Sequence, residues 1–67
     1  MEEVDLVSSL KLLLGTLKVR GALINIGFYV ATGEDQYLDL ARTQIEEADS
    51  CGADTGPAKI SLARYQL

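Results

Sequence analysis

The chain of 67 residues contains no histidine and no tryptophan, and it has only one cysteine and one proline. Without histidine it cannot build a Ser-His-Asp or Cys-His catalytic arrangement. A lone cysteine cannot form a disulfide within its own chain, and a structural zinc site usually needs four Cys or His ligands. Cys51 also has acidic neighbours in the sequence, which favour an inert thiol. From these absences we expect no cofactor, no metal site and no histidine-dependent catalysis.

What the chain does have is a high apolar content, 48%, which is typical of a globular protein. We expect one small domain over residues 1–67. A domain of about 60 residues buries only about 60% of its unfolded surface, whereas ordering costs about 1.5 kcal/mol per residue. Since disulfides and metals are excluded as supports, a homodimer or higher homo-oligomer becomes the favoured expectation. A self-sufficient helical monomer is the alternative.

Charge is unevenly distributed along the sequence, with a formal net charge of −4. Between residues 34 and 54 there are seven acidic residues and a single base, Arg42. Such a surface repels phosphate backbones, so we expect no nucleic-acid binding. Glu46 and Glu47 form a candidate acidic surface for a protein partner that is itself basic. The simpler interpretation is a solvated helix face.

The longest apolar run, Ala22 to Ala31, has ten residues and includes Asn25. Crossing a bilayer takes about 20 apolar residues, and a longer window toward the N-terminus would include Lys18 and Arg20. The opening Met-Glu-Glu lacks the bases with which a signal peptide begins. We therefore expect no membrane partner and a cytoplasmic location.

The first segment, residues 3–19, has the periodicity of a helix. Four leucines follow one another at spacings of four, three and four residues, which lines them along one face; they are Leu6, Leu10, Leu13 and Leu17. Leu12 and Val19 fall on the opposite face. A helix that is apolar on two faces tends to be sandwiched, so the leucines are the predicted self-association interface, with Phe28 in support.

Two further helices are predicted, over residues 21–32 and 35–50. The second of these has a clear amphipathic stripe, formed by Tyr37, Leu38, Ala41, Ile45 and Ala48. The short join between the two helices favours an antiparallel helical hairpin. Residues 21–32 are apolar almost throughout, so an α+β alternative places a strand or hairpin over residues 17–31. Asn25 could bond either across an interface or within the chain.

The C-terminal segment begins with a turn at residues 54–57, where Pro57 suits the first position of a short helix. Its expected inner face is Ile60, Ala63 and Leu67. Asp54-Thr55-Gly56 resembles the Asp-Thr-Gly signature of aspartic proteases. It follows an acidic helix end here rather than a hydrophobic strand, so we expect a turn and no enzyme.

The sequence therefore predicts an all-α bundle of three main helices plus a short C-terminal segment. The favoured function is a non-catalytic protein–protein interaction or self-association module. A monomeric acidic inhibitor or adaptor, bound to a basic surface of a larger protein, is the alternative.

Overall fold

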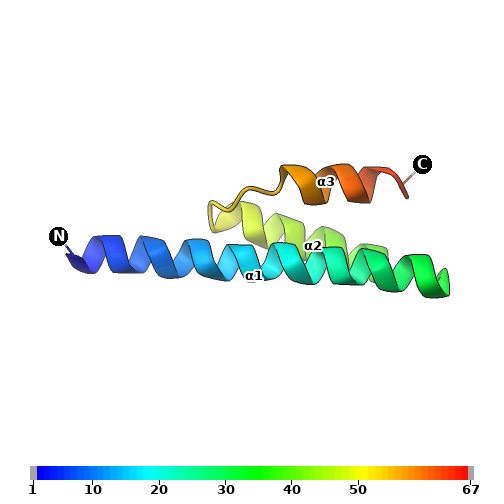
Figure 1. The fold of residues 1–67 in the computed structure, drawn as a ribbon, viewed down its shortest axis with the longest axis horizontal. Helices are drawn as coiled ribbons and strands as arrows, with labels where there is room; N and C mark the ends of the chain where they lie inside the picture. The colour runs from blue at the N-terminus through cyan, green and yellow to red at the C-terminus, as the bar shows by residue number, and fades with distance from the viewer. Residues whose placement is uncertain (1, 67) are drawn as a thin grey trace.

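The computed structural model describes residues 2–66, with side chains from residue 6 onward, and contains three helices and no strand in that range (Figure 1). α1 spans Glu2–Thr32, α2 spans Gln36–Ser50 and α3 spans Gly56–Ala63. The all-α prediction is confirmed. The alternative with a strand or hairpin over residues 17–31 is wrong, because this segment is helical throughout.

α1 is one continuous helix of 31 residues, where the sequence predicted two helices, 3–19 and 21–32. Glycine has a poor helix propensity, and this helix contains several glycines. Gly15 and Gly21, however, lie where later parts of the chain press against α1. A Cβ atom at Gly21 would lie 2.6 Å from the Gln44 amide nitrogen, and one at Gly15 would lie 2.8 Å from the Ala53 Cβ. Close packing at these glycines outweighs their low propensity, so the helix runs through.

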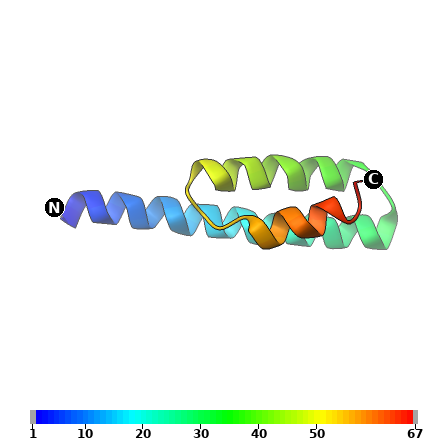
Figure 2. The ribbon, with the colours of Figure 1, turned by 90° about the horizontal axis from the view of Figure 1, so that it is seen from above.

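The turn between α1 and α2 depends on Gly33. Its φ of +74° lies in the left-handed region that suits glycine, and its N–H donates to the Tyr29 carbonyl at 2.7 Å. This conformation ends α1 and sends the chain back, so that α2 runs antiparallel beside the second half of α1 (Figure 2). The helical hairpin predicted from the short join is confirmed.

α2 ends in a Schellman motif centred on Gly52, whose φ is +82°. The Gly52 N–H donates to the Asp49 carbonyl at 3.0 Å, and the Ala53 N–H donates to the Ala48 carbonyl at 3.1 Å. The motif turns Ala53 toward α1, where it contacts the backbone at Gly15. The absence of a side chain at Gly15 is therefore what allows the end of α2 to approach.

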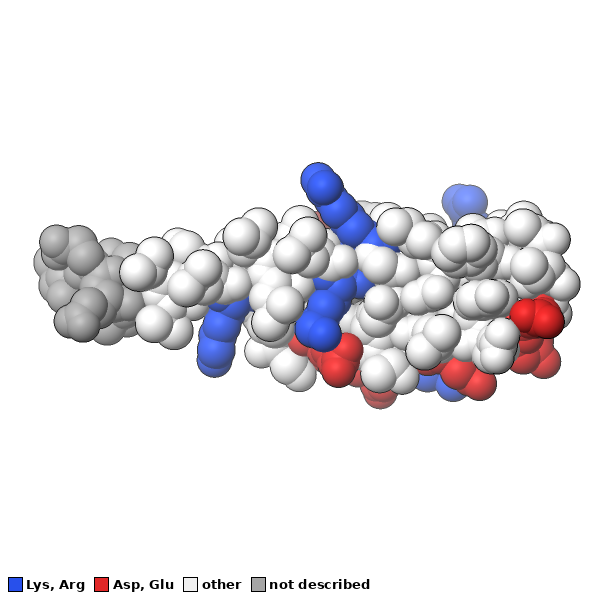
Figure 3. Space-filling model, turned by 90° about the horizontal axis from the view of Figure 1, so that it is seen from below, with Lys and Arg blue, Asp and Glu red and all other residues white. Residues whose placement is uncertain are grey.

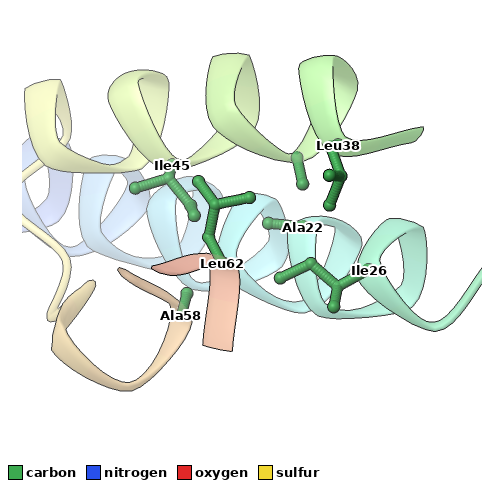
Figure 4. Close-up of a cluster of buried hydrophobic side chains, with 7 residues drawn as sticks. Ala22, Ile26, Leu38, Ile45, Ala58 and Leu62 are labelled. Carbon is green, nitrogen blue, oxygen red and sulfur yellow. The ribbon is translucent and has the colours of Figure 1, made fainter. Parts of the chain in front are cut away.

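The core lies where the three helices meet, and α3 rests over the groove between α1 and α2 (Figures 1 and 4). Its buried apolar residues are Ala22, Ile26, Leu38, Ala41, Ile45, Ala48, Ala58 and Leu62. Figure 4 shows Leu62 of α3 directed between the other two helices. Half of these eight buried residues are alanines, and each alanine has no exposed surface. The helices therefore approach closely, and only four larger buried side chains fill the space between them.

The predicted inner face of the C-terminal helix is wrong. Ile60 is 62% exposed and Ala63 is also exposed, whereas Ala58 and Leu62 face the core. Leu67 lies outside the described residues. An eight-residue helix has little more than two turns, so its periodicity is too short to distinguish the two faces. Pro57 is the second residue of α3, and not the first as the sequence predicts, so it lies in the first turn.

Two polar contacts join α1 to α2 beside the core. The Asn25 side-chain amide donates to the Gln44 side-chain oxygen at 2.7 Å, in a partly buried position. Lys18 forms an ion pair with Glu47 at 3.0 Å. Asn25 therefore finds its partner within the chain, which resolves the alternative that its sequence position left open.

Replacing Gly15 with alanine tests the close approach between α1 and the end of α2. We expect Gly15→Ala to lower the free energy of unfolding by about 1–2 kcal/mol, because the overpacking penalty of about 1–3 kcal/mol exceeds the gain in helix propensity. Gly27→Ala is the matched control, since a Cβ there meets nothing within 4 Å. It should raise the free energy by up to about 1 kcal/mol.

Urea denaturation at one fixed protein concentration measures both effects. Equal stabilisation by the two substitutions would contradict the packing described at Gly15.

Candidate interaction surface

The first half of α1 projects beyond the rest of the molecule. At 1.5 Å per residue, α1 is about 46 Å long and α2 only about 22 Å. The end of α2 reaches back to Gly15, so residues 2–14 extend past the packed helices, as Figures 1 and 2 show. We call this segment the overhang. It gives the molecule its longest dimension of 47 Å.

The four leucines predicted as an interface are all exposed in the structure. Leu6, Leu10, Leu13 and Leu17 have between 56% and 60% of their surface accessible. Large apolar side chains that adjoin one another on a protein surface form a contiguous apolar patch, and such patches mark interaction sites. We call these four residues the leucine stripe.

The leucine stripe lies on the side of α1 that faces away from α2. Leu17 follows the packed Gly15 by two positions, and Ile24 likewise follows the buried Ala22. Two positions turn a helix through about 200°, so the stripe side chains point away from the core. Figure 3 shows a face on which white side chains predominate, with separate Lys and Arg side chains projecting from it and acidic side chains gathered along the lower edge and at the right-hand end.

Phe28 is the least available of the predicted interface residues. It is 49% exposed, and its ring stacks on Tyr37 of α2 with centroids 5.4 Å apart. It also lies about 16 Å along the helix from Leu17. Phe28 therefore packs between the two helices of the hairpin, and the structure does not bring it together with the leucine stripe.

The predicted acidic surface is partly neutralised within the chain. Glu46 and Glu47 are both exposed on α2, but the Glu47 carboxylate pairs with Lys18 of α1 at 3.0 Å. No sequence pattern indicates this pair, because its members are 29 residues apart. An incoming basic partner would have to compete with Lys18 for Glu47.

Asp54-Thr55-Gly56 forms the turn into α3, as predicted. The Asp54 carboxylate accepts a hydrogen bond from the Gly56 N–H at 3.1 Å, as an aspartate does when it initiates a turn. Thr55 is buried, and its hydroxyl donates to the Asp49 carboxylate at 2.5 Å. Lys59 pairs with the other oxygen of Asp49 at 2.9 Å. The tripeptide therefore anchors α3 to the end of α2.

Features that would suggest other kinds of site are few. Among the side chains of residues 6–66, no three from Cys, Asp or Glu gather closely enough to hold a metal ion. Cys51 is half-buried beside Gly15. In the same part of the chain, the helices are too short or too polar to span a membrane. The leucine stripe, a row of exposed apolar side chains, is therefore the candidate interaction site.

A scan against protein-family models finds no match to the chain, and searches of curated proteins and of solved structures find none either. The candidate surface therefore rests on the residues and geometry described above.

The Asp49 cluster predicts a loss of stability at acidic pH. Hydrogen bonds from Thr55, and then from Lys59, lower the pKa of Asp49 below its ordinary value of 3.8. A carboxyl group with a lower pKa in the folded state stabilises the fold above its unfolded pKa. That stabilisation is lost as the pH falls from about 4 through the folded pKa. Asp49→Asn should remove this part of the pH dependence.

Thermal unfolding midpoints measured between pH 6 and pH 2 test this expectation. The control is Glu46→Gln, which removes an acidic group from the same helix outside the cluster. If the pH profile of Asp49→Asn parallels that of the unsubstituted protein, the anchoring role of Asp49 is refuted.

Proposed function

We propose that this protein is a non-catalytic self-association module, in which the leucine stripe on α1 binds a second copy of the chain. The observation that carries the proposal is the exposure of four leucines on one side of a helix whose other side is packed. The module acts by binding. Its lone, half-buried cysteine suits a reducing compartment, and we place the protein in the cytoplasm.

The composition of the core supports this proposal. Its fully buried residues are alanines, and burial of a side chain stabilises a fold in proportion to the apolar area removed from water. Small side chains supply little such area. A second copy placed against the leucine stripe would add larger apolar residues to the buried total, and it would do so where α1 has no other cover among the described residues.

The free energy available from burying the leucine stripe favours a reversible complex. Full burial of a leucine contributes about 1.5–3 kcal/mol, and a little over half of each leucine remains to be buried. Eight leucines, four from each copy, would therefore contribute about 7–14 kcal/mol. Association itself costs about 4–15 kcal/mol. We expect the equilibrium between monomer and oligomer to depend on concentration.

The alternative function, an acidic adaptor for a basic partner, draws less support. Its two candidate residues are Glu46 and Glu47, and Glu47 is already paired with Lys18. Charge reversal at Glu46 should therefore weaken such a complex more than charge reversal at Glu47.

Replacing two stripe leucines tests the proposal. Leu10→Ser with Leu17→Ser should lower the average mass in sedimentation equilibrium from oligomer to monomer, because each dimer loses four apolar contacts. The packed core should stay folded, since both side chains are exposed and surface substitutions change stability by only about 0.5 kcal/mol.

The matched control is Leu40→Ser with Ile60→Ser, which removes two equally exposed apolar residues from α2 and α3. Its mass should equal that of the unsubstituted protein. A chain that is monomeric at every micromolar concentration would disprove self-association, and an equal loss of mass in both double variants would disprove the assignment to the stripe.

A further inference from the structure

The leucine stripe has the spacing of a coiled-coil seam. Its residues alternate at four and three positions, as the a and d positions of a heptad do. The stripe is also symmetric about a point between Lys11 and Leu12. Leu10 and Leu13 are equidistant from that point, and so are Leu6 and Leu17. A two-fold axis through this point would place like surfaces against each other, as closed dimers require.

Charge at the two ends of the stripe distinguishes the possible orientations. The same spacing continued in either direction reaches Glu3 on one side and Arg20 on the other. These two positions are again equidistant from the midpoint. In a parallel pair of helices, Glu3 would oppose Glu3, and Arg20 would oppose Arg20. In an antiparallel pair each glutamate position would oppose an arginine, and charges at such positions set the orientation of coiled coils.

The fold leaves room for an antiparallel partner. α2 and α3 pack on the side of α1 that carries Gly15, Ala22 and Ile26, and the stripe faces the other way. The segment from residue 3 to residue 20 is about 26 Å long. A second α1 can lie along this length without meeting the hairpin of the first copy.

The flanks of the stripe agree with this orientation. Val7 and Leu14 are both about half exposed, and they lie on the same side of the stripe, seven residues apart. In an antiparallel pair, this flank of one helix lies beside the same flank of the other helix, and the two run in opposite directions. Val7 would then approach Leu14 of the second copy, which widens the apolar contact on that flank.

We infer that the second copy binds antiparallel to α1, about a two-fold axis between Lys11 and Leu12. Leu6 then packs against Leu17 of the other copy, and Leu10 packs against Leu13. Glu3 and Arg20 form opposite-charge positions at both ends. This inference rests on the proposed self-association and specifies its geometry.

Charge exchange tests the orientation. Glu3→Arg alone and Arg20→Glu alone each turn both attractive end pairs into repulsive ones, so each should weaken the dimer about tenfold in Kd at low salt. The double variant restores opposite charges and should bind within about twofold of the unsubstituted protein. A parallel dimer already opposes like charges at both positions, so neither single variant would weaken it.

Crosslinking with a short bismaleimide tests the register independently, in a Cys51→Ala background. Leu6→Cys alone and Leu17→Cys alone should give almost no covalent dimer, whereas an equal mixture of the two variants should crosslink. Efficient crosslinking of Leu6→Cys with itself would overturn the antiparallel orientation. The absence of any dimer in sedimentation would instead overturn the proposed self-association, so the two failures are distinguishable.

Discussion

α1 is about twice as long as the helix that packs against it, and most other properties of the structure follow from this mismatch. α2 covers the second half of α1 and stops at Gly15, where its Schellman turn meets the glycine backbone. The first half of α1 then continues as the overhang, with apolar side chains on its surface. An isolated helix of this length is marginal in water. The overhang therefore has a physical reason to acquire a partner.

In the packed part of the molecule, small residues let the helices approach closely, and few large side chains fill the core. Alanines on all three helices and glycines on α1 let the backbones come near one another. Specific polar contacts fix the arrangement, namely Asn25 with Gln44 and Lys18 with Glu47. Thr55 and Lys59 converge on Asp49 to hold α3. The larger aliphatic side chains of α1 are left mostly outside this core, where they are exposed to solvent.

The sequence was sufficient to predict the parts of the fold that depend on local chemistry. The amphipathic stripe of α2 and the turn at Gly33 follow from periodicity and from glycine conformation. The continuity of α1 could not be predicted, because it depends on contacts of Gly15 and Gly21 with Ala53 and Gln44, which are distant in sequence. The inner face of α3 was missed because two turns of helix give too little periodicity. For the candidate surface, the leucine spacing located the stripe, but only the packing of the opposite face shows that it is left uncovered.

Residue-level hydrogen exchange, measured across a range of protein concentrations, would detect a second copy that covers the overhang. Amides at residues 6–14 should become more protected as concentration rises, because coverage by a partner stabilises this part of α1. Amides around Ala22 and Ala41, in the packed core, should change far less. Protection over residues 6–14 that is the same at every concentration would show that no second copy covers the overhang.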